Sequence, residues 1–217
     1  MQAFIICGGK GTRVKEYTDK YNCEKHEIPI NGKPFIGYME DWLYEYVKAI
    51  NYVTVSDVGT GGAMIYEYEN IMNRWDTPYL FIYGDCYCPF NIIDAYKYFT
   101  YVDADVLVIT KKVDVPDYGW IRTRFGTDEI FKYVRNHDET EYQTNIGTYI
   151  FNAKALEFMY NTCEGYPSSF EKDYMESGLL FQHLNVVGYS MFDSIPYYDV
   201  GTPERIESTK LILGVDS

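Results

Sequence analysis

QAFIICGGKGTR, residues Gln2–Arg13, is a short apolar strand that runs directly into a loop of glycines and charged residues. Glycine reaches φ angles that other residues avoid, so such a loop lets backbone N–H groups approach a ligand closely. The loop also carries two cations and a hydroxyl, which suits a polyphosphate; an ordinary turn with exposed charges is the alternative. The candidate phosphate contacts are Gly8, Gly9, Lys10, Gly11, Thr12 and Arg13.

Neither of two common phosphate-loop motifs fits this loop. A Walker A loop, G-x-x-x-x-G-K-[ST], needs Ser or Thr after its lysine, but Gly11 follows Lys10. A dinucleotide fingerprint, G-x-G-x-x-G, begins correctly at Gly9 but has Val14 at its last position. The loop therefore predicts phosphate binding without belonging to either class.

Length and charge restrict the kinds of protein that this chain could be. Its 217 residues fit one domain with a full core, and its 24 Tyr and 12 Phe give much of the apolar surface a polar tip or a flat face. The net charge of −13 argues against nucleic acid as a partner, because such proteins neutralise phosphates with clustered Lys and Arg. An anionic small substrate would then need a local basic patch or a metal ion.

The cysteines and the hydropathy pattern indicate a soluble protein of the cytoplasm. Five scattered cysteines do not form a disulfide framework, and the pair Cys86 and Cys88 lacks the second pair or histidines of a zinc site. No run of 18 apolar residues and no signal-peptide pattern occurs, so no membrane partner is expected. The tyrosines could cover a homo-oligomer interface or a core, and we favour a core.

The first half of the chain predicts an α/β fold. Strand-length apolar runs at 4–7, 52–55, 79–83 and 105–110 alternate with helix-like segments near 35–48, 62–74 and 91–99. Alternation of this kind favours a largely parallel sheet with flanking helices.

The second half predicts mixed sheet and helices. Strand-like segments at 119–124, 129–135, 145–152 and 184–189 flank helix-like segments near 153–160 and 169–180. A last helix is expected to run to about Leu213, with Thr202 as its N-cap and Pro203 as its first residue.

Two aspartates follow predicted strands, where ligands of open parallel sheets bind. Asp85 comes after YLFIYG, and Asp199 lies between an aromatic pair and Val200-Gly201. Taken singly, each aspartate is more often a turn-capping residue. Together with the opening loop, the two carboxylates suit Mg²⁺, which prefers one or two protein carboxylates plus phosphate oxygens and water.

The chain resembles the sugar-1-phosphate nucleotidyltransferases along its whole length. Six segments occur in the order typical of that family: a G-G-x-G-T-R loop, a lysine segment, T-G-G-A, G-D, N-x-G and D-V-G-T-P-E. They are Gly8–Arg13, 24–36 with Lys25, Thr60–Ala63, Gly84–Asp85, Asn145–Gly147 and Asp199–Glu204. Each segment alone is a weak signal, but six in this order are a strong one.

The resemblance implies a three-layer Rossmann-like nucleotidyltransferase fold of the GT-A type, with a mostly parallel mixed sheet. A single domain, 1–217, would hold a nucleotide-binding half at 1–110 and a sugar-phosphate-binding half at 111–217. The implied reaction is the Mg²⁺-dependent transfer of a nucleotidyl group from an NTP to a sugar 1-phosphate, with release of pyrophosphate, in nucleotide-sugar and polysaccharide biosynthesis.

The resemblance also implies roles for individual residues. Arg13 and the loop amides would hold the β- and γ-phosphates, and Lys25 the α-phosphate or the attacking phosphate. Asp85 and Asp199 would coordinate Mg²⁺, and Gly61 and Gly62 would lie beside the nucleobase. The sugar-phosphate contacts would be Gly119, Arg135, Asn145 and Lys172.

Two further segments suggest a branch of the family. Residues 168–177, SSFEKDYMES, are most similar to the branch that activates heptose 1-phosphate with GTP, and LFIYGD is similar to the glucose-1-phosphate cytidylyltransferases. GTP or CTP is therefore the expected donor, while the acceptor and the oligomeric state stay open.

The chain departs from the family pattern in three places. Lys25 lies between Glu24 and His26 instead of prolines, and the usual E-K-P segment is Arg135-Asn136-His137. Arg135 could replace the lost cation, although a solvated arginine is the commoner case. Thirdly, only one strand-like stretch lies between the helix ending near Lys48 and Thr60, where the family usually has a strand, a helix and another strand. This segment is too short for a crossover, so one βα unit is missing and the sheet is narrower or the nucleobase pocket less covered.

Three alternatives to this reaction remain. The chain could be a nucleotide- or sugar-binding regulator of the same fold that has lost turnover. It could transfer the nucleotidyl group to a phosphorylated non-sugar such as phosphocholine. A metal-dependent glycosyltransferase ranks last, because its D-x-D turn is replaced by Asp85-Cys86-Tyr87.

Overall fold

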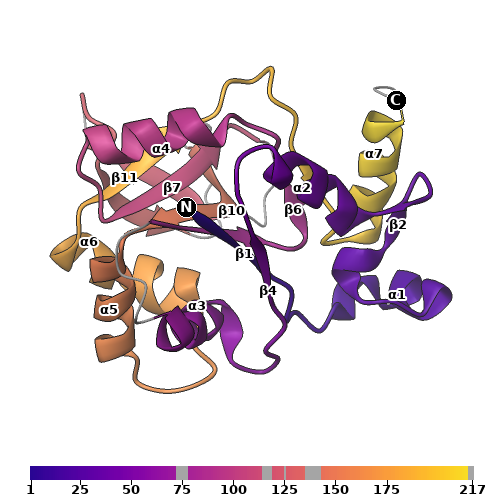
Figure 1. Ribbon diagram of the computed structural model, residues 1–217, viewed down its shortest axis with the longest axis horizontal. Helices are drawn as coiled ribbons and strands as arrows, with labels where there is room; N and C mark the ends of the chain where they lie inside the picture. The colour runs from indigo at the N-terminus through magenta and orange to yellow at the C-terminus, as the bar shows by residue number, and fades with distance from the viewer. Residues whose placement is uncertain (72–77, 114–118, 125, 135–142, 215–217) are drawn as a thin grey trace.

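The computed structural model describes residues 1–71, 78–113, 119–124, 126–134 and 143–214, and it shows a mixed sheet with helices on both faces (Figure 1). The strands are β1 (Gln2–Ile6), β2 (Pro29–Ile30), β3 (Lys33–Pro34), β4 (Ile50–Val53), β5 (Tyr79–Tyr83), β6 (Cys86–Tyr87), β7 (Val106–Lys111), β8 (Trp120–Thr123), β9 (Ile130–Val134), β10 (Gln143–Phe151), β11 (Val186–Ser190) and β12 (Tyr198–Asp199). The helices are α1 (Lys15–Tyr21), α2 (Phe35–Tyr44), α3 (Gly59–Ile71), α4 (Ile92–Tyr101), α5 (Ala153–Thr162), α6 (Leu179–His183) and α7 (Pro203–Leu213), with the 3-10 turns η1 (Thr12–Val14) and η2 (Lys25–Glu27) and the π-helix η3 (Phe170–Glu176).

The main sheet has the order β11-β7-β10-β5-β1-β4. β1 is parallel to β4 and β5, and β7 is parallel to β11, whereas β10 runs antiparallel to both β5 and β7. This arrangement confirms the predicted mostly parallel mixed sheet. β4 ends the path, and the chain passes from it directly into α3, without the additional strand and helix that the family resemblance would place there.

The strands β1, β5 and β7 are buried on both faces, which is why their sequences are mostly apolar. Ala3 and Ile5 of β1 belong to a core cluster with α2 and α4, while Phe4 belongs to a second cluster with α3, α5 and η3. The same alternation holds in β5, where Leu80 and Phe81 point into different clusters. Successive side chains of a strand point to opposite faces, so this alternation produces the three layers.

The C-terminal helix lies beside the N-terminal region of the chain (Figure 1). Its start is as predicted, because the Thr202 side chain accepts a hydrogen bond from the backbone N–H of Arg205 and Pro203 is the first helical residue. Tyr17 of α1 donates a hydrogen bond to Glu207 of α7 over 2.8 Å. The helix thereby holds the segment that follows the opening loop.

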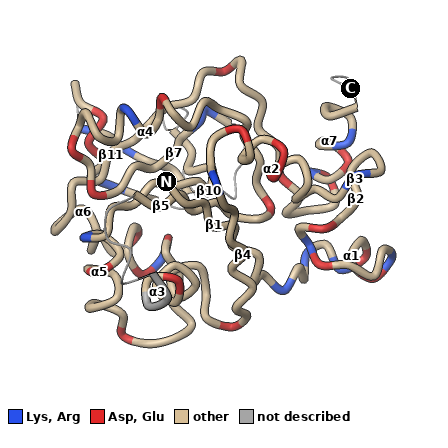
Figure 2. The backbone as a smooth tube through the Cα atoms, in the orientation of Figure 1, with Lys and Arg blue, Asp and Glu red and all other residues tan. Residues whose placement is uncertain are grey.

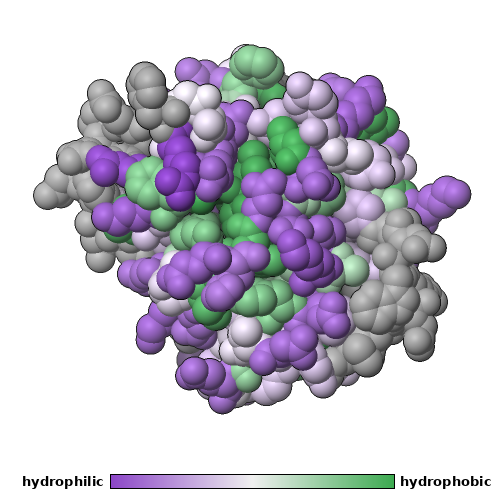
Figure 3. Space-filling model, turned by 90° about the vertical axis from the view of Figure 1, so that its left-hand side faces the viewer, coloured by the Kyte–Doolittle hydropathy of each residue, from purple (hydrophilic) through white to green (hydrophobic). Residues whose placement is uncertain are grey.

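The surface is of mixed character. Figure 3 shows a strip of hydrophobic residues bordered by hydrophilic ones on the face that it presents. A membrane-spanning helix needs about 20 mostly apolar residues, and no helix in the described ranges provides such a stretch.

Candidate active site

A groove of adjoining hollows follows the carboxyl ends of β1 and β5. Hollows of about 660 Å³ and about 140 Å³ share Lys25, and the second shares Asp85 with a third of about 290 Å³. This is the sheet edge at which the sequence predicted the site. The predicted residues that line these hollows are Gly9, Lys10, Gly11, Thr12, Arg13, Lys25, Asp85, Gly119, Asn145 and Asp199.

Neighbouring glycines of the opening loop have different surroundings. A Cβ atom on Gly8 would lie 2.2 Å from the carbonyl oxygen of Val55, so only glycine fits where the opening loop packs against the backbone at Val55. A Cβ atom on Gly9 would have no atom within 4 Å, and Gly9 lines the 140 Å³ hollow. Gly11 adopts the left-handed conformation, with φ of 60°, and begins η1. Gly8 therefore shapes the loop, and Gly9 leaves space next to it.

The two cations of the loop differ in their partners. Lys10 forms an exposed ion pair with Asp57 at 2.6 Å, which holds it at the outer end of the groove. Arg13 lines the 290 Å³ hollow, and none of the carboxylates in the described ranges forms an ion pair with it. Figure 2 shows that basic residues gather along the chain leading into α1, despite the negative charge of the whole protein. An anionic ligand in the 660 Å³ hollow would meet Lys10, Lys15 and Lys25, while Asp19, Glu24 and Glu27 line the same hollow.

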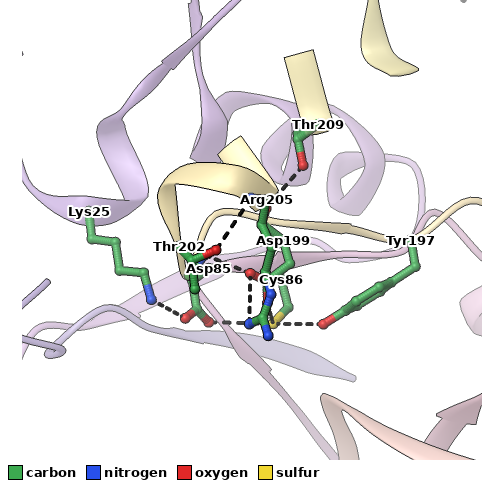
Figure 4. A network of polar contacts seen from close by, with 9 residues as sticks. Lys25, Asp85, Cys86, Tyr197, Asp199, Thr202, Arg205 and Thr209 are labelled. Carbon is green, nitrogen blue, oxygen red and sulfur yellow. Dashed lines mark hydrogen bonds and ion pairs between the residues drawn. The ribbon is translucent and has the colours of Figure 1, made fainter. Parts of the chain in front are cut away.

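Lys25 and Asp85 form an ion pair between η2 and the end of β5 (Figure 4). Reciprocal hydrogen bonds between Glu24 and Glu27 hold η2, and so position Lys25 without the flanking prolines. Burial opposes ionisation of Asp85, but the charge and hydrogen bond of Lys25 lower the pKa of its carboxyl group below the ordinary value. Asp85 is thus kept as a carboxylate at the wall of the groove.

A two-strand pairing that the sequence did not predict brings Asp199 next to Asp85. β12 pairs antiparallel with β6, and the register sets Asp199 opposite Cys86. The Cys86 sulfur lies 3.4 Å from an Asp85 oxygen and 3.8 Å from an Asp199 oxygen (Figure 4). Burial, reinforced by both aspartates, raises the pKa of the Cys86 thiol well above its ordinary value, so the group between the carboxylates is neutral.

Asp199 is also held by groups at and just before the start of α7. The backbone N–H of Gly201 donates to one carboxylate oxygen over 2.6 Å, and the Arg205 guanidinium lies 3.5 Å from the same oxygen. Arg205 lines the 290 Å³ hollow but was missed from the sequence. Its signal was its place in the first turn after the D-V-G-T-P-E segment, where a side chain of α7 can reach back to the strand.

The protein supplies only part of the ligand set that magnesium needs, and a bound phosphate ligand and water would supply the rest. No group of three or more Cys, His, Asp or Glu side chains in the described ranges is arranged to hold a metal ion. Asp85, in the turn before β6, and Asp199, in β12, supply two carboxylates to the same hollow. Magnesium accepts this number of protein carboxylates when phosphate oxygens and water complete its shell.

The predicted sugar-phosphate side is assembled around Asn145. Its backbone N–H donates to the Gly119 carbonyl over 3.0 Å, and both residues line the 290 Å³ hollow. A Cβ atom on Gly119 would collide with the Tyr133 hydroxyl at 1.8 Å, so the glycine makes room for that ring. Gly147, with φ of 72°, likewise makes room for Tyr83.

Glu171 lies in this hollow, and its neighbour Lys172 does not. Glu171 is 8% exposed and accepts hydrogen bonds from the hydroxyl groups of Tyr83, Tyr149 and Thr60. Lys172, predicted as a sugar-phosphate contact, lines a separate hollow of about 600 Å³ instead. Arg135 lies outside the described residues.

Gly61 and Gly62, predicted to lie beside the nucleobase, are contacted by the protein itself. The carbonyl oxygen of Ser168 accepts a hydrogen bond from the Gly62 N–H over 3.1 Å. A Cβ atom on Gly61 would lie 3.0 Å from the Ser168 hydroxyl, and one on Gly62 2.8 Å from the Tyr166 ring. The two small residues thus let the 166–170 segment pack on the start of α3.

Neither the known protein-family models nor the curated protein sequences give a significant match to this chain. Solved structures do. HddC from Yersinia pseudotuberculosis matches with a TM-score of 0.71 and 22% identity, over 98% of this chain and 99% of that one, and it has also been solved with GMP-PN. A UDP-glucose pyrophosphorylase solved with UDP-glucose matches with a TM-score of 0.77 and 18% identity, over 100% and 99% of the two chains.

A third structure is a glucose-1-phosphate thymidylyltransferase, described as putative in its own name, from Bacillus anthracis. It matches with a TM-score of 0.72 and 16% identity, over 98% of this chain and 94% of that one. At these identities the likeness concerns the fold. The chain has the Rossmann-like mixed-sheet fold that sugar-1-phosphate nucleotidyltransferases have.

Proposed function

We propose that the protein transfers a nucleotidyl group from a nucleoside triphosphate to a sugar 1-phosphate and releases pyrophosphate. The observation that carries the proposal is the convergence of Arg13, Lys25, Asp85 and Asp199 on one groove. Supporting it, structures of the same fold have been solved with a nucleotide, GMP-PN, and with a sugar nucleotide, UDP-glucose. GTP or CTP is the proposed donor, because the sequence resembles the heptose-1-phosphate guanylyltransferase and glucose-1-phosphate cytidylyltransferase branches.

The chain's own residues would mainly position the reactants and neutralise charge. Arg13, with its fork of N–H donors, would hold the β- and γ-phosphates as they become the leaving group. Lys25, poised between two hollows, would contact the α-phosphate or the attacking phosphate. A phosphate oxygen of the acceptor attacks the α-phosphorus, and the bond from that phosphorus to the pyrophosphate oxygen breaks. The attacking phosphate is already ionised, so no side-chain base is required.

Asp85 and Asp199 would hold Mg²⁺. The ion when bound would neutralise phosphate charge that grows during the transfer. Lys25 keeps Asp85 ionised, and Gly201 and Arg205 orient Asp199. The neutral Cys86 thiol between them adds no charge to the site.

A phosphorylated cation such as phosphocholine is a second candidate acceptor. The 290 Å³ hollow is lined by the Glu171 carboxylate and by Tyr83, Tyr133 and Tyr197, and no cation in the described ranges pairs with Glu171. Carboxylates and tyrosine rings attract quaternary ammonium groups. This composition favours neutral or cationic acceptors over acidic ones.

The test is pyrophosphate release by the purified protein with Mg²⁺. Each of ATP, GTP, CTP and UTP is paired with glucose 1-phosphate, mannose 1-phosphate, a heptose 1-phosphate, glucuronic acid 1-phosphate and phosphocholine. Release with at least one sugar 1-phosphate is expected, and release with phosphocholine alone would select the second candidate. NTP binding by calorimetry without release from any pair would replace both with a binding regulator.

A further inference from the structure

We propose that Glu171 is a positioning residue that fixes the direction of the Asn145 side-chain amide toward the acceptor. The inference rests on the proposed function, in which Asn145 contacts the acceptor. It concerns a chain of hydrogen bonds that runs from Asn145 through Tyr149 to Glu171.

The orientation of the Asn145 amide is determined by a backbone group. The N–H of Gly147 lies 3.0 Å from one terminal atom of the amide, and because an N–H can only donate, that atom is the oxygen Oδ1. The nitrogen Nδ2 therefore faces the Tyr149 hydroxyl, 2.6 Å away. Asn145 donates this bond, and the Tyr149 oxygen accepts it.

The Tyr149 proton must then point elsewhere, and Glu171 receives it. The hydroxyl lies 3.3 Å from Oε1 of Glu171, to which the Tyr83 hydroxyl also donates, and 3.5 Å from the Tyr83 oxygen. The carboxylate oxygen is both nearer and charged, which makes it the stronger acceptor of the two. Burial, followed by the charge of Glu171, raises the pKa of Tyr149 well above the ordinary value, so its hydroxyl remains a donor. A carboxylate accepts and never donates, which gives the chain a single direction.

The other carboxylate oxygen of Glu171, Oε2, also accepts two hydrogen bonds. Thr60 accepts from the N–H of Phe170 over 3.0 Å and donates to Oε2 of Glu171 over 3.1 Å. Ser169 accepts from the N–H of Lys172 over 3.2 Å and donates to Oε2 over 3.5 Å. Four donors thus occupy the four accepting positions of one carboxylate, so Glu171 supports its neighbours and forms no hydrogen bond of its own to the acceptor.

The consequence is a defined pattern on the wall of the 290 Å³ hollow. Asn145 and Tyr83 both line it. The second N–H of Nδ2 offers a donor, and the Tyr83 oxygen, whose proton is committed to Glu171, offers an acceptor. Replacing Glu171 by Gln puts an N–H donor where donors already converge, so one of these directions must be lost.

The first test observes the amide directly and does not require turnover. The Asn145 side-chain resonances in a ¹⁵N–¹H spectrum are assigned by their absence in Asn145→Ala. Glu171→Gln and Tyr149→Phe are each expected to shift them, and Glu176→Gln, the same change at an exposed site of the same helix, is expected not to. Unchanged Asn145 resonances in folded Glu171→Gln would overturn the inference.

The second test separates positioning from general support. With the best NTP and acceptor pair of the panel, Glu171→Gln and Tyr149→Phe are each expected to raise the acceptor KM about tenfold, the effect of one lost hydrogen bond, and the NTP KM by less than twofold. The double variant should be no worse than either single one. Equal rises in both KM values, or multiplying effects in the double variant, would contradict the inference. Shifted resonances in a protein whose wild type never releases pyrophosphate would leave the network standing and refute the proposed function.

Discussion

The opening loop contains two adjacent glycines whose replacement by alanine has different expected results. In Gly8→Ala the new methyl carbon would lie 2.2 Å from the Val55 carbonyl oxygen, whereas ordinary contact begins near 3.4 Å. Backbone atoms on both sides must move by about 1 Å, and overpacking of this kind costs about 1–3 kcal/mol. For a domain of this size each kcal/mol lowers Tm by about 2–4 °C, so we expect a loss of about 2–12 °C.

Gly9→Ala is the matched control for stability and the probe for binding. Its Cβ atom has no neighbour within 4 Å, and Gly9 does not have a positive φ. Alanine at such a site stabilises by up to about 1 kcal/mol through the unfolded chain. Because the methyl group would enter the hollow proposed to hold phosphates, we expect NTP affinity to fall about tenfold, the equivalent of about 1.4 kcal/mol.

Both variants are measured by thermal unfolding without ligand and by calorimetric titration with the preferred NTP. The expected pattern is an unstable Gly8→Ala and a stable Gly9→Ala with weakened NTP binding. A Gly8→Ala protein as stable as the wild type would refute the packing argument. A Gly9→Ala protein that binds NTP normally would show that phosphates do not approach this part of the loop.

Two further predictions concern charges. Arg13→Ala is expected to lower kcat/KM for pyrophosphate release about 100-fold, because a cation that stabilises developing phosphate charge is worth several kcal/mol. The control Lys20→Ala, at an exposed position of α1, should change kcat/KM less than twofold. Equal effects of the two substitutions would contradict the role of Arg13. Asp105→Asn tests pH dependence away from the groove: burial opposes ionisation, but hydrogen bonds from Lys154, Asn152 and the Asn185 backbone lower the Asp105 pKa. Because the Asp105 pKa is lower in the folded protein than in the unfolded chain, the carboxylate stabilises the fold at pH values above the unfolded pKa of about 4. This stabilisation is lost as the pH falls through the folded pKa. The variant should therefore melt several degrees below wild type at pH 7 and converge with it toward pH 3, and a constant difference from pH 7 to pH 3 would refute the linkage.

Local signals in the sequence predicted most of the framework. The strand at 79–83 and the helix starting at Pro203 have the predicted positions, because apolar runs and capping residues act over a few neighbours. The helix expected over 169–180 is broken instead. Gly178 adopts a φ of 79° between η3 and α6, and no periodicity in the sequence distinguishes the π-helical turn from an α-helix.

The sequence predicted several residues of the site but not the contacts that bring them together. Asp85 and Asp199 were expected at one sheet edge, but their closeness depends on the pairing of β6 with β12, two strands too short to have a pattern. Glu171 was missed because its partner Tyr83 lies far away in the chain. Arg205 is close to Asp199 in the chain, but its contact with that carboxylate depends on how α7 folds back toward β12. Gly61 and Gly62 pack against the 166–170 segment, which only the tertiary structure brings there, and their place beside the nucleobase stays a prediction.

The central claim is that Asp85, Asp199, Lys25 and Arg13 form the centre of a nucleotidyl-transfer site. The most direct measurement is pyrophosphate release by wild type and Asp85→Asn with the best pair of the panel, beside Asp41→Asn, the same change at an exposed aspartate of α2. We predict release by wild type and Asp41→Asn, and at least a 100-fold lower rate for Asp85→Asn, in line with about 2.7 kcal/mol of lost charge stabilisation. Wild-type release that persists within tenfold in a folded Asp85→Asn protein would contradict the claim.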